Sequence, residues 1–189
     1  RSIKIKFLNA MLKNLEQSLR GNLGTSNQNP IIDTLSQHQI PKQLVTFGLA
    51  NIPKGLLYEV IYFFTFFTQM PFLELLTKPF IIDPLNTLIE NLPNENIDKS
   101  FKLINGLLQY ISLNPDRIPL FLISEESSPL IEKFSYLLAN ELYYSEFGPI
   151  LIRIFYSMKS TPGLMNYILT YSPLVQTIID ICKDCVQKG

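Results

Sequence analysis

Residues 128–137 read SPLIEKFSYL: a serine, a proline, and then apolar residues at helical spacing. Two related stretches are DPLNTLIENL at 83–92 and SPLVQTIIDI at 172–181. In each of them Ser or Asp stands where a helix N-cap is preferred, and proline follows where the first helical turn needs no amide donor. The three stretches therefore predict three helices that begin in the same way.

The prolines of these stretches are almost equally spaced. Pro84, Pro129 and Pro173 are separated by 45 and then 44 residues, and a looser fourth copy begins at Pro41. Two later positions are apolar in all three copies. These two columns are Ile89, Phe134 and Ile178, and then Leu92, Leu137 and Ile181. Equal spacing with matched apolar columns indicates an internal repeat.

Each repeat also contains a long and a short apolar segment ahead of its proline-started helix. The long segments are 55–69, 101–113 and 148–159, and the short ones begin at Pro71, Pro115 and Pro162. A period of about 44 residues lies within the roughly 40–47 of HEAT and armadillo repeats, and three helices per repeat favour the armadillo type. No alternation of polar and apolar residues is long enough to predict a sheet. We expect an all-α, armadillo/HEAT-like right-handed α-solenoid of about four three-helix repeats, with an irregular helical domain as the alternative.

The same pattern predicts one domain over residues 1–189, a fragment of a longer protein. One repeat cannot bury its own apolar face, so the ends of such an array need a polar cover. Residues 1–20 mix charged and apolar positions and predict an N-terminal capping helix. Residues 21–30 are rich in Gly, Asn and Ser and predict a flexible loop, which leaves the repeats to 31–189.

The composition argues against several classes of function. Lys and Arg together number 16, as do Asp and Glu, so the net charge is zero, without the basic excess of a nucleic-acid-binding protein. The most apolar stretch, 56–70, contains Glu59 and is shorter than the roughly 20 residues of a transmembrane helix. The chain has only two cysteines, which fits the reducing cytoplasm. We therefore expect a cytoplasmic protein with no transmembrane segment.

No group of residues predicts catalysis, a metal site or a cofactor. Cys182 and Cys185 form a C-x-x-C pair, but structural zinc takes four ligands and the chain adds only one histidine, His38. The pair stands late in an expected helix, where the helix dipole opposes a thiolate. We interpret the two cysteines as small apolar fillers and His38 as a surface or capping residue. An enzyme is the weakest hypothesis.

Protein binding is the stronger hypothesis, because the long helix of each armadillo repeat commonly carries the ligand. Polar residues three, four or seven positions apart share one face of these expected helices. The candidate protein-binding residues are Glu59 and Tyr62, then Lys102, Asn105 and Gln109, and then Arg153 and Ser157. A merely solvated face is the alternative for each stripe.

Residues 35–69, LSQHQIPKQLVTFGLANIPKGLLYEVIYFFTFFTQ, resemble the N-terminal region of the FHIP family, the Hook-interacting subunits of the FTS–Hook–FHIP complex. The shared pattern is a polar segment with His38, an apolar helix ending in LVTFGL, a turn at Pro53 and Gly55, and an aromatic pair at Phe63 and Phe64. Residues 70–89 continue the pattern in the same order, and residues 148–180 are similar to a later helical repeat of that family.

The resemblance implies a non-catalytic adaptor on early endosomes. Its partners would be a Hook-type adaptor, an FTS-type E2-like protein and an endosomal Rab GTPase, and it would link endosomes to dynein-based transport. No partner-contact residue can be carried over from the family position by position. The alternative is a generic armadillo or HEAT interaction domain, or a small-GTPase-binding regulatory domain of another complex.

Overall fold

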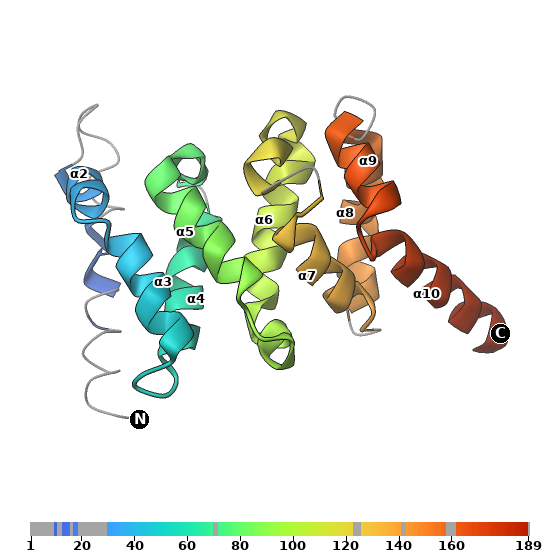
Figure 1. The fold of residues 1–189 in the computed structure, drawn as a ribbon, viewed down its shortest axis with the longest axis horizontal. Coiled ribbons are helices and arrows are strands. Elements are labelled where there is room, and N and C mark those ends of the chain that lie inside the picture. The colour runs from blue at the N-terminus through green and yellow to red at the C-terminus, as the bar shows by residue number, and fades with distance from the viewer. Residues whose placement is uncertain are drawn as a thin grey trace. The chain divides into compact units, whose positions relative to one another are not determined.

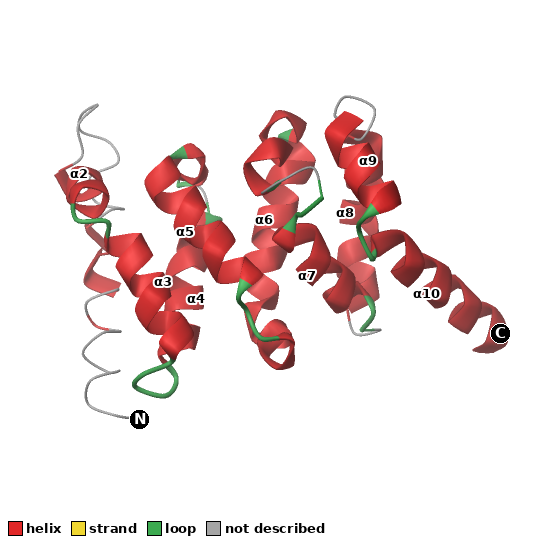
Figure 2. Cartoon of the chain, in the orientation of Figure 1, coloured by secondary structure: helices red, strands yellow, loops and turns green. Residues whose placement is uncertain are grey.

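The computed structural model describes residues 10, 13–15, 17–18, 30–69, 72–122, 126–140, 143–157 and 162–188. These residues form helices and loops, with no β-strand in this part of the chain (Figure 2), which confirms the predicted all-α class. The expected loop at 21–30 lies outside the described residues except for Pro30, and so does most of the expected capping helix. The chain divides into two compact units, Arg1–Asn91 and Leu92–Gly189, and each is described by itself.

The N-terminal unit is organised around α3. Its described elements are α2 (Pro30–Gln37), α3 (Ile40–Ala50), α4 (Leu56–Phe67), the 3-10 helix η1 (Leu73–Thr77) and α5 (Pro79–Glu90) (Figure 1). Helix α3 packs against α2, α4 and α5, while η1 packs against α4 and α5. A cluster of phenylalanine rings from α4 and the segment after it fills the core, since Phe64, Phe67 and Phe72 are completely buried.

A glycine allows the close approach of α3 and α4. A Cβ atom added at Gly48 would lie 2.9 Å from Cγ2 of Val60, closer than side chains tolerate. Val60 is itself completely buried. The residue type at position 48 therefore limits how near the two helices can come.

Helix α5 begins five residues earlier than the sequence predicts. The expected start was Pro84 with Asp83 as its N-cap, but the helix begins at Pro79 after the extended residue Lys78, and Pro84 lies inside it. The Lys78–Pro79 pair is the true start signal, because proline suits the first turn of a helix. Pro84 has no amide hydrogen and cannot pair with the carbonyl of Phe80, the usual partner one turn back.

The C-terminal unit contains η2, α6, η3, α7, α8, α9 and α10. Their bounds are Asn94–Ser100, Phe101–Leu113, Pro115–Phe121, Pro129–Leu138, Tyr144–Ser157, Pro162–Thr170 and Leu174–Lys188. Helix α6 packs against α7 and α8, and α10 packs against α7 and α9. The long, short and proline-started segments predicted here are helical, as α6, η3 and α7 and as α8, α9 and α10, but α10 with 15 residues is no shorter than α8 with 14.

Most of the predicted helix starts in this unit are confirmed. Helix α6 has the predicted bounds, α7 begins at Pro129 after Ser128, and α9 begins at Pro162. The amide of Leu174, the first residue of α10, donates to the hydroxyl of Ser172 at 3.1 Å, as expected of a helix cap. Helix α8 begins at Tyr144 rather than at 148, so Pro149 lies inside it.

The leucine that follows each repeat proline is buried. Leu85, Leu130 and Leu174 are at most 1% exposed. The three prolines themselves are not equivalent, because Pro84 is inside a helix, Pro129 is the first residue of one and Pro173 precedes one. Of the two predicted apolar columns, the members in the first two copies, Ile89, Phe134, Leu92 and Leu137, are buried, whereas Ile178 and Ile181 on α10 are half-buried.

Candidate protein-interaction site

The two predicted binding residues of α4 differ in how much of their side chains is exposed. Tyr62 is 52% exposed, whereas Glu59 is only 9% exposed and belongs to the interior of the N-terminal unit. The expected exposed stripe is therefore wrong at Glu59. Helix α4 is buried on most of its circumference, and the polar residue type at 59 did not reveal this.

The predicted residues of α6 share one face, as expected. Lys102 and Gln109 are exposed and Asn105 is half-buried, and the amide nitrogen Nε2 of Gln109 donates to Oδ1 of Asn105 at 3.4 Å. Arg153 is exposed on α8, and the side chain of Ser157 lies outside the described residues. The structure joins two of these candidates directly, and the binding role of all of them stays a prediction.

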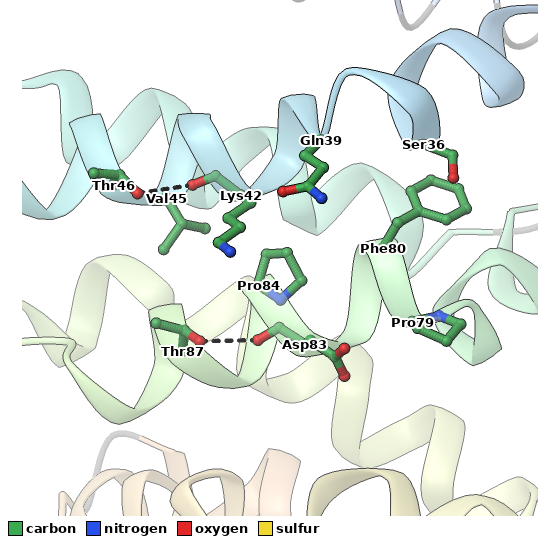
Figure 3. Close-up of a pocket in the computed structure, with 10 residues that line it drawn as sticks. All are labelled: Ser36, Gln39, Lys42, Val45, Thr46, Pro79, Phe80, Asp83, Pro84 and Thr87. Carbon is green, nitrogen blue, oxygen red and sulfur yellow. Dashed lines mark hydrogen bonds between the residues drawn. The ribbon is translucent and has the colours of Figure 1, made fainter.

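A groove in the N-terminal unit is lined by several polar side chains. It has a volume of about 560 Å³ and lies between α3, with the end of α2, and α5 (Figure 3). One wall consists of Ser36, Gln39, Lys42, Val45 and Thr46, and the other of Pro79, Phe80, Asp83, Pro84 and Thr87. A volume of this size is typical of ligand sites.

Each wall of the groove carries one charged residue with a threonine four positions later. The Thr46 hydroxyl donates to the carbonyl oxygen of Lys42, and the Thr87 hydroxyl donates to that of Asp83, both at 3.0 Å (Figure 3). The Lys42 side chain extends toward Pro84 across the groove, while the Asp83 carboxylate stands on the opposite wall (Figure 3). Sequence reasoning missed these residues, because only the packing of α3 against α5 brings them together.

The C-terminal unit exposes apolar side chains on α8 and α9. Ile152, Phe155 and Tyr156 are 62%, 37% and 73% exposed and lie on one face of α8. Met165 and Leu169, four positions apart on α9, are exposed as well. Single exposed apolar residues are ordinary, whereas large contiguous apolar patches often mark contact surfaces.

Lys133 is a buried charge whose hydrogen bonds serve the fold. Its ammonium donates to the carbonyl oxygen of Leu92 at 2.7 Å and to Oδ1 of Asn94 at 2.9 Å, which joins α7 to the start of η2. Burial lowers the pKa of Lys133, and the carboxylate of Glu132 opposes part of that shift.

Tyr167 is a second buried polar side chain of this unit. Its hydroxyl lies 3.4 Å from both the Ser128 carbonyl oxygen and Oε1 of Glu132, and it has one proton to donate. Burial and the nearby Glu132 charge raise the pKa of Tyr167 to about 12. This tyrosine holds α9 to the start of α7, and we assign it a structural role.

The two cysteines stand late in α10, as predicted, but they do not fill a core. Cys182 and Cys185 are both free and exposed, because their half of α10 lies on the surface of the unit. The described residues contain no cluster of three or more His, Cys, Asp or Glu side chains placed to hold a metal ion. Within the same ranges, none of the helices combines the length and apolar character that a membrane crossing requires.

Comparison of the chain with protein-family models, with curated proteins and with solved structures finds no match.

Proposed function

We propose that the chain is a non-catalytic helical scaffold that binds protein partners. In this proposal the recurring sequence of a long segment, a short segment and a proline-started helix forms an armadillo-like array, and the array presents helix faces to other proteins. The regular 44–45-residue spacing of the prolines and the buried leucine after each one support this arrangement. Such arrays display extended surfaces because each repeat contacts only its neighbours.

The exposed apolar face of α8 carries the proposal. Ile152 and Tyr156 expose more than half of their surface to water, one turn apart on the same helix. Covering apolar surface is favourable by roughly 25 cal/mol per Å². A partner that covers this face therefore gains binding energy without any rearrangement of the helix.

The resemblance of residues 35–69 to the FHIP family directs the choice of partners. We propose that the chain joins a Hook-type adaptor and an FTS-type E2-like protein, and so links early endosomes to dynein. It would reach the endosome only through its partners, among them a Rab GTPase, and it would need no cofactor. The alternative is a generic armadillo or HEAT scaffold that serves another complex or binds a small GTPase in a regulatory domain.

Reconstitution from purified components tests the proposal. The chain is mixed with a Hook-type adaptor and an FTS-type protein, and complexes are separated by size-exclusion chromatography. We expect a complex that Ile152→Glu together with Tyr156→Glu weakens strongly. Leu113→Glu, a substitution of an exposed leucine at the end of α6, is the matched control and should leave the complex intact. Absence of any complex with the unmodified chain would contradict the adaptor function.

A further inference from the structure

We propose that the groove between α3 and α5 binds an extended peptide segment of a partner protein, with one acidic and one basic side chain flanking an apolar one. This inference rests on the proposed scaffold function in one respect, that the occupant is a protein. It concerns a surface separate from the α8 face, with its own residues and its own charges.

The dimensions of the groove suit a short extended segment. On the α3 wall the lining runs from Gln39 to Thr46, eight residues, so this wall is about 12 Å long at 1.5 Å per residue. An extended chain advances about 3.4 Å per residue, so about four residues span the wall. The lining also contains apolar residues: Val45 and Pro84 are buried, and the half-buried Phe80 ring extends toward Ser36 at the α2 end of the groove (Figure 3).

The charges of the groove specify an occupant that carries both signs. Lys42 and Asp83 are exposed on opposite walls, and neither makes an ion pair with another described residue. Because the lining holds one positive and one negative group, a polyanion such as a nucleic acid gains little from it. A segment with an acidic side chain near Lys42 and a basic one near Asp83 is complementary to both walls.

The uncharged polar groups of the walls fit the backbone of such a segment. The hydroxyl hydrogens of Thr46 and Thr87 are donated to their own helices, so the hydroxyl oxygens remain available as acceptors. Pro84 leaves the Phe80 carbonyl without its usual donor on the same face of α5. An extended peptide brings unpaired amide donors, which these acceptors can use.

The rim of the groove holds a residue in an unfavourable backbone conformation. Gln39, between α2 and α3, has φ 47° and ψ 38°, the left-handed region that residues other than glycine seldom adopt. Its amide side chain points toward the groove (Figure 3). Conformations of this kind cluster at binding sites, because the surrounding structure must hold them in place.

Fluorescent heptapeptides test the inference on the full chain. One set places Glu, Leu and Lys at alternate positions, a second set reverses the two charges, and a third replaces both with Gln. We expect fluorescence anisotropy to show that the peptide with one of the two charge orders binds more tightly than the Gln peptide. The double variant Lys42→Glu with Asp83→Lys should then prefer the reversed order, with a change in relative affinity of about tenfold or more.

Two controls keep the result interpretable. Lys54→Glu, at an exposed lysine in the loop between α3 and α4 and outside the groove lining, should leave the preference unchanged, and far-UV circular dichroism should show that the double variant is folded. Equal binding of charged and Gln peptides, or an unchanged preference in the folded double variant, would overturn the inference. Full competition by a free amino acid would also overturn it, because the groove would then be a small-molecule site.

The Hook and FTS reconstitution separates this inference from the proposed function. If the peptides fail to bind while the Hook and FTS complex forms, only the peptide groove is wrong. If the peptides bind with the expected preference and no Hook or FTS complex forms, the groove stands and the adaptor function is wrong.

Discussion

Lys133 is nearly buried in the C-terminal unit, yet its ammonium is hydrogen-bonded to Leu92 and Asn94. We predict that Lys133→Met lowers the free energy of unfolding by about 1–3 kcal/mol, because two acceptors lose their donor while the side-chain volume is kept. Urea denaturation measures this loss. Lys102→Met, at an exposed position of α6, is the matched control and should change stability little. Equal stability of the Lys133→Met protein and the unmodified chain would show that the hydrogen bonds of Lys133 contribute nothing to the free energy of unfolding.

Tyr167 makes the stability of its unit sensitive to alkaline pH. Its pKa is raised to about 12, against about 10 for an unfolded tyrosine, so the unfolded chain loses this proton first as pH rises. The resulting stability is fully present below pH 10 and is lost between roughly pH 10 and 12, by about 2–3 kcal/mol in total. We predict that Tyr167→Phe removes this pH-dependent contribution to the free energy of unfolding.

The measurement compares unfolding free energies of the two proteins at several pH values. The advantage of the unmodified chain over Tyr167→Phe should shrink above pH 10, while Tyr171→Phe, at an exposed tyrosine, should show a constant difference. The raised pKa of Tyr143 and the lowered pKa of Lys133 act in both proteins and cancel from the comparison. If the difference in unfolding free energy between the unmodified chain and Tyr167→Phe stayed constant with pH, it would contradict the raised pKa of Tyr167.

Residue types alone predicted the apolar core well and the buried polar groups poorly. Leu85, Leu130 and Leu174 could be identified from their spacing, since a repeated leucine at a helix start is normally buried. Glu59 and Lys133 could not, because a charged residue predicts exposure unless its partners are known. The partners of Lys133 lie about 40 residues away along the chain, so their contact depends on how the helices pack.

At the scale of helices, the contact of α3 with α4 depends on Gly48. We predict that Gly48→Ala destabilises the chain by about 1–3 kcal/mol, because the new methyl group would overlap Val60 and force the helices apart. Gly148→Ala on α8 is the matched control, since a Cβ there meets no atom within 4 Å. It should stabilise the helix by up to about 1 kcal/mol.

Thermal unfolding followed by circular dichroism distinguishes the two substitutions. Opposite shifts of the melting temperature are expected, downward for Gly48→Ala and upward for Gly148→Ala. A neutral Gly48→Ala would mean that α3 and α4 are less tightly packed than described.

The helices themselves were predictable where their apolar spacing was uninterrupted. Helix α6 has the predicted bounds because FKLINGLLQYISL is a continuous amphipathic run between polar boundaries. The starts of α5 and α8 were predicted too late, because Pro84 and Pro149 resemble helix starts and lie inside helices instead. Helix α2 was missed, since its eight residues follow a stretch rich in loop-forming residue types.

At the scale of the whole molecule, the repeat is the basis of the functional proposal. Three helical segments follow one another in α4, η1 and α5, in α6, η3 and α7, and in α8, α9 and α10, although α9 is an α-helix where the first two groups have a 3-10 helix. The candidate surfaces were less predictable than this order. Predicting the groove would require knowing that α3 packs beside α5. Predicting the exposed face of α8 would require knowing which of its apolar residues other helices leave uncovered.

An experimental structure of the chain is the most direct test of the repeat. Residues 56–90, 101–138 and 144–188 would be superposed pairwise on their helix axes. We predict that the three segments superpose as one three-helix module, with Leu85, Leu130 and Leu174 on the same buried face and the same rotation between successive modules. Superposition that places the three leucines on different helix faces, or finds no common rotation, would contradict the array and the scaffold function drawn from it.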